Sequence, residues 1–329
     1  MDVRYTPEQR ALRASVARVV DRLGVRAVGH LGDLERSARL DAAIAASGWR
    51  QLRSATDDGR PWASAVEVAI VAEELARGLA DSPFLGPTLA AELRRCAGAP
   101  DARTTETVAL GPDLAEVIVT GTVAVAIDVA GAEAALVVGA DGVLSAVAVD
   151  GAPTTVDLTR PTTAVAIAGG EVIGAVAADD LRRTSALALA ATTADLVGTM
   201  QGALDLTVAY AKDREQYGAP IGSFQAVAHL LAEAVVHLEG SRTALLHAAW
   251  AVDVLDPAAA VAAAASAKAY AARAAREVCE IAIQVHGGIG HTWECLAHVH
   301  LRRALLATDI LGGVGPNLAR VLDHVGIES

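Results

Sequence analysis

The chain has 329 residues, enough to bury a large core and to form two or three domains. Its formal net charge of −12 argues against nucleic acid as a partner, because phosphate binding needs a basic face. No apolar run reaches the length of about 18 residues that a membrane span needs, and residues 1–5 lack the apolar core of a signal peptide, so we expect a cytoplasmic protein.

Residues 1–100 have the pattern of a helical domain. Thr6 followed by Pro7 is a cap with proline at the first helical position, and apolar residues then recur at helical spacing. Further helices are predicted at about residues 35–47, 63–79 and 87–96.

Residues 101–182 change to short β-branched runs separated by turn signals such as Asp141-Gly142 and Gly169-Gly170. This pattern predicts a small antiparallel β domain of about six or seven strands. The predicted strands cover residues 116–126, 134–138, 143–149, 154–158, 164–168 and 171–176.

Residues 183–329 return to the helical period. Long helices are predicted at about 184–213, 223–252 and 258–285, and a last one begins near residue 293. We expect these to form an antiparallel four-helix bundle, in which the alanine-rich stretch 258–275 allows close packing. The predicted fold class is therefore α+β, mostly α, with helical, β and helical domains in that order.

The segment 213–227 carries the strongest chemical signal. Arg214 and Tyr217 stand at the end of one predicted helix, a Gly/Pro break follows, and a new helix opens at Ser223. A fixed cation, a flat ring and free helix N-terminal N–H groups together suit the phosphates and adenine of a dinucleotide.

A second polar, glycine-rich corner follows at residues 284–294. Its glycines let backbone N–H groups approach a ligand closely, although a plain helix C-cap would also use them. Four histidines lie in or near this corner, but their spacing matches no usual metal motif, so we predict no metal site. The three cysteines lack CxxC spacing and are expected to be reduced thiols.

Together the two corners resemble the C-terminal domain of the acyl-CoA dehydrogenase family of flavoproteins. The resemblance is strong over residues 183–311, fair over 1–100 and poor over 101–182. It implies a shared FAD, contacted by one subunit in the site of its neighbour. The matching FAD-contacting residues are Arg214, Tyr217, Phe224, Gln225, Gln284, Val285, His286, Gly287 and Gly288.

The family's catalytic base is missing from both places where the family puts it. These enzymes need a carboxylate to remove the proton alpha to the thioester carbonyl. One family position for that Glu aligns with Gly312, and the alternative position on the first long C-terminal helix aligns with Ala188. Asp309 is the nearest remaining carboxylate and is a candidate displaced base, although a solvated charge at a helix end explains it as well.

The β domain also lacks the family motifs that cradle the flavin ring and the substrate carbonyl. The chain thus resembles the degenerate subunit of the heterotetrameric (α2β2) acyl-CoA dehydrogenases of actinobacterial steroid catabolism. This resemblance implies a second, catalytically complete subunit as partner, a bulky steroid side-chain CoA ester as substrate, and an electron-transfer flavoprotein as acceptor.

Two alternatives stay open. In the first, the chain is a self-sufficient homo-oligomeric flavoenzyme that uses Asp309. In the second, it is a non-catalytic subunit that binds acyl-CoA or supports assembly.

Overall fold

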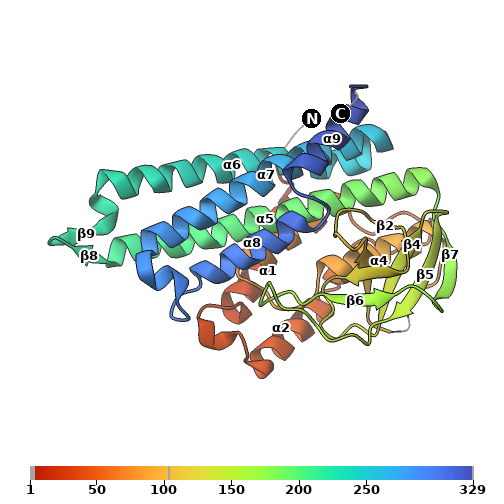
Figure 1. The fold of residues 1–329 in the computed structure, drawn as a ribbon, viewed down its shortest axis with the longest axis horizontal. Helices are drawn as coiled ribbons and strands as arrows, with labels where there is room; N and C mark the ends of the chain where they lie inside the picture. Colours follow the sequence, from red (N-terminus) through yellow and green to blue (C-terminus); the bar gives the residue numbers. More distant parts are fainter. Residues whose placement is uncertain (1–3, 103, 328–329) are drawn as a thin grey trace.

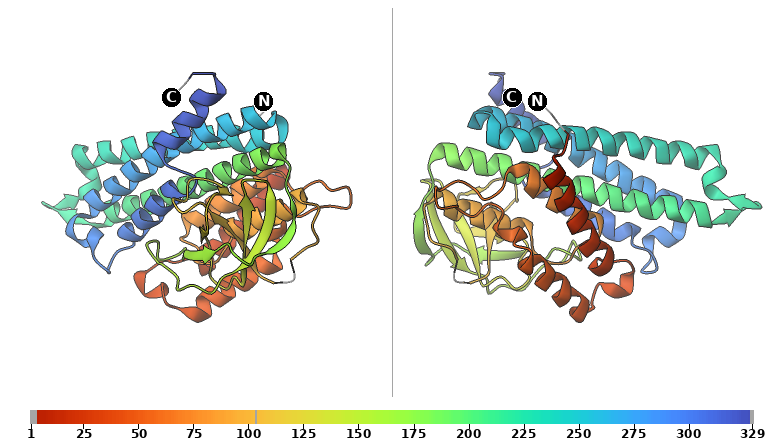
Figure 2. Two further views of the ribbon diagram at one scale, coloured as in Figure 1. Left: turned by 45° about the vertical axis from the view of Figure 1, so that its right-hand side comes forward. Right: turned by 180° about the vertical axis from the view of Figure 1, so that it is seen from behind.

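The computed structural model describes residues 4–102 and 104–327. Helices come first and last along the chain, and a small β-sheet lies between them in sequence. The long C-terminal helices run side by side, with the sheet at one end of the molecule and a short hairpin, β8 with β9, at the other (Figure 1). The N-terminal helices lie against one flank of this bundle (Figure 2). The predicted helix–sheet–helix order is therefore confirmed.

Within residues 4–102, four α-helices form the N-terminal part, and two of them begin with a reciprocal cap. The Thr6 hydroxyl accepts from the N–H of Gln9 at 3.2 Å, and Gln9 Oε1 accepts from the N–H of Thr6 at 3.0 Å. Ser64 and Glu67 make the same arrangement. The helices are α1 (Pro7–Leu23), α2 (Leu34–Ala46), α3 (Ala65–Arg77) and α4 (Leu85–Cys96).

The sheet is mixed, which corrects the expectation of a wholly antiparallel domain. Its strands run in the order β6-β3-β1-β4-β5-β7, with β2 beside β4. Both β1 and β2 pair with β4 in parallel, whereas the other pairs are antiparallel. The strands are β1 (Glu106–Leu110), β2 (Ile118–Val119), β3 (Val123–Ala126), β4 (Ala134–Gly139), β5 (Val143–Ala148), β6 (Thr163–Ala166) and β7 (Glu171–Ala175).

Two strand predictions are wrong in detail. β1 is a central strand that the sequence pattern does not predict. The predicted strand at 154–158 is a loop with a single bridge, Thr154 to Thr162. This loop carries Asp157 into the interior, where it is fully buried.

In the described C-terminal part, three long helices and a shorter fourth form the bundle. The helices are α5 (Ala178–Asp213), α6 (Gln225–Val254), α7 (Pro257–His286), α8 (Ala297–Asp309) and, crossing the bundle, α9 (Val314–His324). α5 begins earlier than the predicted start at about residue 184. None of the helices in the described ranges is both long and apolar enough to cross a bilayer.

Small residues let the helices approach closely. A Cβ at Gly198 of α5 would lie 2.0 Å from the carbonyl oxygen of Glu73, and one at Gly202 would lie 2.2 Å from that of Arg77. Only glycine allows α3 to pack this near to α5. The alanines of α7 are likewise buried against α5 and α6, as the alanine-rich stretch predicts.

Candidate functional site

The first predicted corner is a hairpin that projects from one end of the bundle (Figure 1). β8 (Glu215–Gln216) pairs with β9 (Ala219–Pro220) through a two-residue connection of Tyr217 and Gly218. Both connecting residues have positive φ, 54° and 76°, as the tightest hairpin turns require. This turn holds the Tyr217 ring 97% exposed to solvent.

The side chains of this corner face outward. The Tyr217 ring meets Phe224 edge to face, with ring centroids 6.4 Å apart. The main chain of Arg214 is fixed, because its N–H donates to the Tyr210 carbonyl and its carbonyl accepts from Ile221. Among the described residues, the Arg214 guanidinium has no hydrogen-bond or ion-pair partner. α6 then opens at Gln225 without a side-chain cap, so its first N–H groups are also available.

The second predicted corner lies at the same end of the bundle, where α7 ends and α8 begins (Figure 1). His286 joins the two corners, since its ring stacks on Tyr210 of α5 with centroids 4.4 Å apart. The His286 ring is buried and its Nδ1 lies 2.7 Å from the Ala282 carbonyl oxygen. Burial lowers its pKa, so we assign His286 a packing role rather than a free polar contact.

The glycines of the second corner differ in whether the local backbone conformation requires glycine. Gly287 ends α7 with a φ of 64°, which accounts for glycine there. Gly288 has no positive φ, and a Cβ built on it meets no atom within 4 Å. Packing within the chain does not explain Gly288, and its surface is free for an outside group. Gln284 is exposed and Val285 is half-buried beside them.

These residues fit one part of an FAD. An unpaired guanidinium, an exposed ring, an uncapped helix start and a glycine surface are the groups that bind pyrophosphate and adenosine. They lie at the end of the bundle opposite to the chain's own sheet (Figure 1). The residues that would hold the dinucleotide are Arg214, Tyr217, Phe224, Gln225, Gln284 and Gly288.

Neither of the two positions that the resemblance aligns with a catalytic base has room for a larger side chain. Ala188 is fully buried in α5. Gly312 follows α8 with a φ of 78°, and a Cβ there would lie 2.9 Å from Pro316 Cβ. The Gly312 carbonyl is held by the Asn317 amide at 2.8 Å and by Lys268 Nζ at 3.1 Å. The backbone conformation and the close packing at this corner therefore require glycine, and a glutamate there would be strained.

Asp309 is the last residue of α8 and is exposed to solvent. It does not line the cavity beside Gly312, which is described next. A general base for an alpha proton has to meet its substrate in a water-excluded site. This placement agrees with the reading of Asp309 as a solvated charge.

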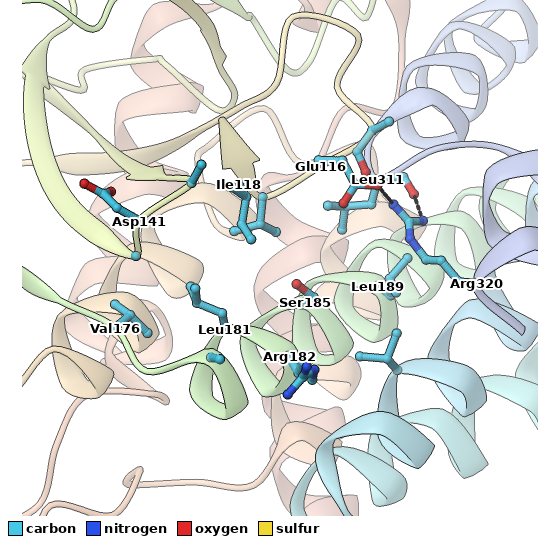
Figure 3. A pocket seen from close by; sticks show the side chains of 16 residues that line it. Glu116, Ile118, Asp141, Val176, Leu181, Arg182, Ser185, Leu189, Leu311 and Arg320 are labelled. Atoms are coloured by element: carbon cyan, nitrogen blue, oxygen red, sulfur yellow. Dashed lines mark hydrogen bonds and ion pairs between the residues drawn. The ribbon is translucent and has the colours of Figure 1, made fainter. Parts of the chain in front are cut away.

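A cavity of about 500 Å³ opens beside both positions, between the sheet and the start of α5 (Figure 3). Leu189 and Leu311, the neighbours of Ala188 and Gly312, line it. Arg320 of α9 borders it and bonds the Leu311 and Ala115 carbonyls at 2.8 and 2.7 Å. Neither this cavity nor the role of Lys268, the one lysine of the alanine-rich stretch, is predictable from the sequence, because both depend on packing between distant segments.

A buried ion network ties the domains together next to this region. Arg160, from the loop after the predicted strand 154–158, pairs with Asp128 at 2.8 Å and Asp195 at 2.7 Å. Arg303 of α8 pairs with the same Asp195 at 2.6 Å. Burial alone would raise the pKa of Asp195, but the two guanidiniums lower it, so it stays ionised. Burial lowers the pKa of nearby His300 to about 3, which keeps it neutral.

In the described ranges, no group of three or more His, Cys, Asp or Glu side chains is arranged to hold a metal ion. His298 instead meets Trp293 edge to face, at 4.9 Å between centroids. Burial raises the pKa of Cys279 to about 12 and of Cys96 to about 11, so both thiols stay protonated.

Comparisons with known proteins agree with this architecture. Residues 186–317 match the family described as "Acyl-CoA dehydrogenase, C-terminal domain". Acyl-CoA dehydrogenase IpdE2 of Mycolicibacterium smegmatis is 33% identical over 259 residues, which cover 78% of this chain and 77% of IpdE2. Acyl-CoA dehydrogenase FadE34 of Mycobacterium tuberculosis is 46% identical over 144 residues, 42% of this chain but only 20% of FadE34. The chain belongs to the acyl-CoA dehydrogenase family.

Solved structures confirm the fold over nearly the whole chain. The ChsE4–ChsE5 complex from Mycobacterium tuberculosis aligns with a TM-score of 0.80 and 26% identity, covering 99% of each chain. A variant of the Tcur3481–Tcur3483 steroid ACAD aligns with a TM-score of 0.79 and 23% identity, covering 97% of this chain and 98% of that one. The predicted fold class, an acyl-CoA dehydrogenase fold with helical, β and helical parts, is confirmed.

Proposed function

We propose that this chain is the non-catalytic subunit of a FAD-dependent acyl-CoA dehydrogenase and completes the FAD site of a second, catalytically complete subunit. In this proposal, residues 183–329 supply the cofactor contacts and the oligomer interface, while residues 1–100 and the shortened β domain of residues 101–182 complete the fold. The observation that carries it is twofold. The residues that would hold the dinucleotide, here called the cofactor face, are exposed, and the two expected base positions hold no carboxylate.

The position of the cofactor face favours a contribution to the FAD site of a partner subunit over a site within this chain. Arg214, Tyr217 and Gly288 are exposed, and the β8–β9 hairpin and the end of α7 that carry them lie at the end of the bundle opposite to the chain's own sheet (Figure 1). Arg214 would bind the pyrophosphate as a fixed cation, since its backbone is held on both sides. Tyr217 would cover the adenosine, and the open surface of Gly288 would let the dinucleotide approach the backbone.

When bound, FAD supplies the hydride acceptor of the dehydrogenation. This chain's own part is to hold and orient the dinucleotide and to exclude water from its end of the site. The proton alpha to the thioester would go to a carboxylate of the partner, since Ala188 and Gly312 bear none.

The names of structural relatives support the assembly and the substrate class. One of the similar structures is called the ChsE4–ChsE5 complex, and another, named by two components as Tcur3481–Tcur3483, is called a steroid ACAD. We therefore propose an α2β2 assembly that acts on a bulky steroid side-chain CoA ester and passes electrons to an electron-transfer flavoprotein. A homo-oligomeric enzyme using Asp309 has less support, because that carboxylate is exposed and lies outside the cavity lining.

The test is to measure flavin per chain and assembly mass, by absorbance and native mass spectrometry. The chain is made alone and with an acyl-CoA dehydrogenase subunit encoded beside it. We expect little flavin on the chain alone and one FAD for each pair of unlike subunits. One FAD per chain in a homo-oligomer would overturn the proposal.

Replacing Arg214 by alanine tests the role of the cofactor face directly. Loss of one charge-assisted hydrogen bond should weaken FAD binding by the complex by about 10- to 100-fold. The measurement is FAD retention on dilution, with assembly checked by mass. Arg60→Ala is the matched control, because Arg60 is also an exposed arginine and lies in the N-terminal part. Equal FAD retention by the Arg214→Ala and Arg60→Ala complexes would contradict the assigned role.

A further inference from the structure

Two histidines near the second corner lie beside an arginine of α8 and have no role in the proposed cofactor binding. His298 and Arg302 are four residues apart on α8, so they lie on one face of the helix, one turn apart. His291 and Trp293 come from the connection between α7 and α8, at the end of the bundle opposite to the sheet (Figure 1). These four side chains, His291, Trp293, His298 and Arg302, are here called the α8 patch.

Arg302 differs from most arginines of the C-terminal helices in its partners. Arg183 bonds two carbonyls at the end of α6, and Arg214 belongs to the cofactor face. Arg302 makes one hydrogen bond, to the Val156 carbonyl at 3.3 Å, and has no carboxylate partner among the described residues. The other six form ion pairs with carboxylates: Arg182, Arg242, Arg273, Arg276, Arg303 and Arg320. In a chain of net charge −12, a half-buried arginine without a carboxylate can accept an anion from outside.

His298 lies between two basic neighbours. Burial lowers its pKa, and Arg302 and His291 lower it further, because each repels a positive charge on the ring. His298 Nε2 has no hydrogen-bond partner in the part of the chain that the structure describes. Glu294, the nearest acid along the chain, is exposed and forms no ion pair with any described residue. The basic groups of the α8 patch are therefore not neutralised by a carboxylate within the described ranges.

Trp293 adds a flat ring to these basic groups. The ring meets His298 edge to face, with centroids 4.9 Å apart, and Trp293 is 61% exposed. An exposed indole can stack on a flat group of a ligand, while the arginine beside it binds the negative charge of the same ligand. The α8 patch thus combines the two contacts that a ring-bearing anion needs.

We propose that the α8 patch binds a phosphate monoester that carries a flat ring, with the phosphate at Arg302 and His298 and the ring on Trp293. A phosphate fits better than a carboxylate, because its charge of nearly −2 and its three acceptor oxygens match the N–H groups of one arginine and two histidines. The patch shares no residue with the cofactor face, so the two sites can be tested separately.

The experiment is equilibrium dialysis of the full chain with adenosine monophosphate (AMP) and, separately, with inorganic phosphate. We expect saturable binding of AMP and weaker binding of phosphate at the same site. Arg302→Ala should weaken the binding of both by about 10- to 100-fold, because one charge-assisted contact is lost. Trp293→Ala should weaken AMP binding about five- to a hundredfold and leave phosphate binding unchanged, because only AMP has a ring to stack.

Two further variants separate this site from other arginines. Arg276→Ala is the matched control and should bind AMP like the parent, since Arg276 is exposed on α7 and already pairs with Glu280. Arg214→Ala removes any AMP that is bound at the cofactor face. A saturable AMP site that survives Arg214→Ala and is lost in Arg302→Ala would support the proposal.

All variants are first compared with the parent by thermal unfolding, so that a loss of fold is not taken for a loss of the site. Should Arg302→Ala unfold, the ratio of AMP to phosphate binding in Trp293→Ala decides alone. Absence of AMP binding, AMP binding that depends only on Arg214, or an equal effect of Trp293→Ala on AMP and phosphate would overturn the proposal. The test needs no flavin and no partner, so its failure is distinguishable from failure of the proposed function.

Discussion

Lys268 shows at the scale of one residue how the Gly312 corner is held. Its side chain is fully buried in α7, and Nζ donates to the carbonyls of Thr308 at 2.8 Å and Gly312 at 3.1 Å. No carboxylate forms an ion pair with it among the described residues, and burial lowers its pKa to about 7. The ammonium is costly to bury, so the neutral amine is favoured in the folded state above pH 7.

This pKa makes the stability of the protein depend on pH in a defined window. Between about pH 7 and the unfolded value of 10.5, the unfolded chain keeps the Lys268 proton that the folded chain has lost. The free energy of unfolding should therefore rise with pH through this window and be constant with respect to this group below pH 7, where both states carry the proton. One pKa unit corresponds to about 1.4 kcal/mol, so the effect amounts to a few kcal/mol.

Lys268→Met should remove this contribution. We expect the difference in unfolding free energy between the variant and the parent to shift in favour of the variant as pH falls from 10 to 7, measured by denaturant titration at each pH. Lys212→Met is the control, since Lys212 is the chain's other lysine and is exposed at the end of α5. The same pH dependence in parent and Lys268→Met would show that the buried amine does not titrate in this range.

At the scale of elements, the turn of the β8–β9 hairpin holds a residue that suits the proposed cofactor contact but strains the backbone. Tyr217 occupies a left-handed position at a φ of 54°, where asparagine or glycine is preferred. Tyr217→Asn should leave the melting temperature unchanged or slightly higher. It should also weaken FAD retention by the complex about five- to fiftyfold, in line with the loss of one stacking partner.

Tyr217→Phe separates the ring from the hydroxyl. It keeps the aromatic surface and the same backbone strain, so we expect both FAD retention and melting temperature to match the parent. If Tyr217→Asn and Tyr217→Phe retained FAD equally well, the exposed ring would have no part in cofactor binding.

The helices are predictable from sequence to within a few residues at most ends, because caps and apolar periodicity are local. α1 begins at Pro7 behind the Thr6 cap, and α7 begins at Pro257 behind Asp256. β1 escapes prediction for a physical reason. All five of its residues are buried, including Glu106, whose carboxylate pairs with Arg94 at 2.6 Å. A central strand covered on both faces shows no alternation of polar and apolar residues.

The candidate cofactor face was predictable by residue type but not by position. Arg214, Tyr217 and the glycine corner are recognisable in the sequence, yet only the structure brings them to one end of the bundle. It also separates His286, buried against Tyr210, from its exposed neighbours Gln284 and Gly288. Side-chain direction at a helix end depends on the neighbouring helix, which the local pattern does not contain.

At the scale of the whole molecule, Arg320 connects the two halves. From α9 it bonds the carbonyl of Ala115 and the carboxylate of Glu116 in the β domain, and the carbonyl of Leu311 in the bundle. The N–H of Leu311 also donates to the Leu114 carbonyl at 2.7 Å. One side chain therefore supports the contact between sheet and bundle at the edge of the cavity.

Arg320→Ala should loosen this junction. We expect faster amide hydrogen exchange in residues 114–119 and 311–313, and a melting temperature lower by a few degrees, because Arg320 loses four hydrogen bonds, three of them partly buried. Arg276→Ala is the matched control, since Arg276 is an exposed bundle arginine paired only with Glu280 one turn away. Exchange that rose equally in both variants, or in neither, would contradict an interdomain role for Arg320.

The sequence by itself determined the helix–sheet–helix order, the two polar corners and the absence of a carboxylate at Ala188 and Gly312, since these follow from residue identity and short-range spacing. Only the tertiary structure decided that the corners meet at one end, that the Lys268 amine lies against the Gly312 carbonyl, and that Arg302 has no carboxylate partner among the described residues. Each of these depends on which distant segments pack together, and that choice is made by the burial of the whole core rather than by any local pattern.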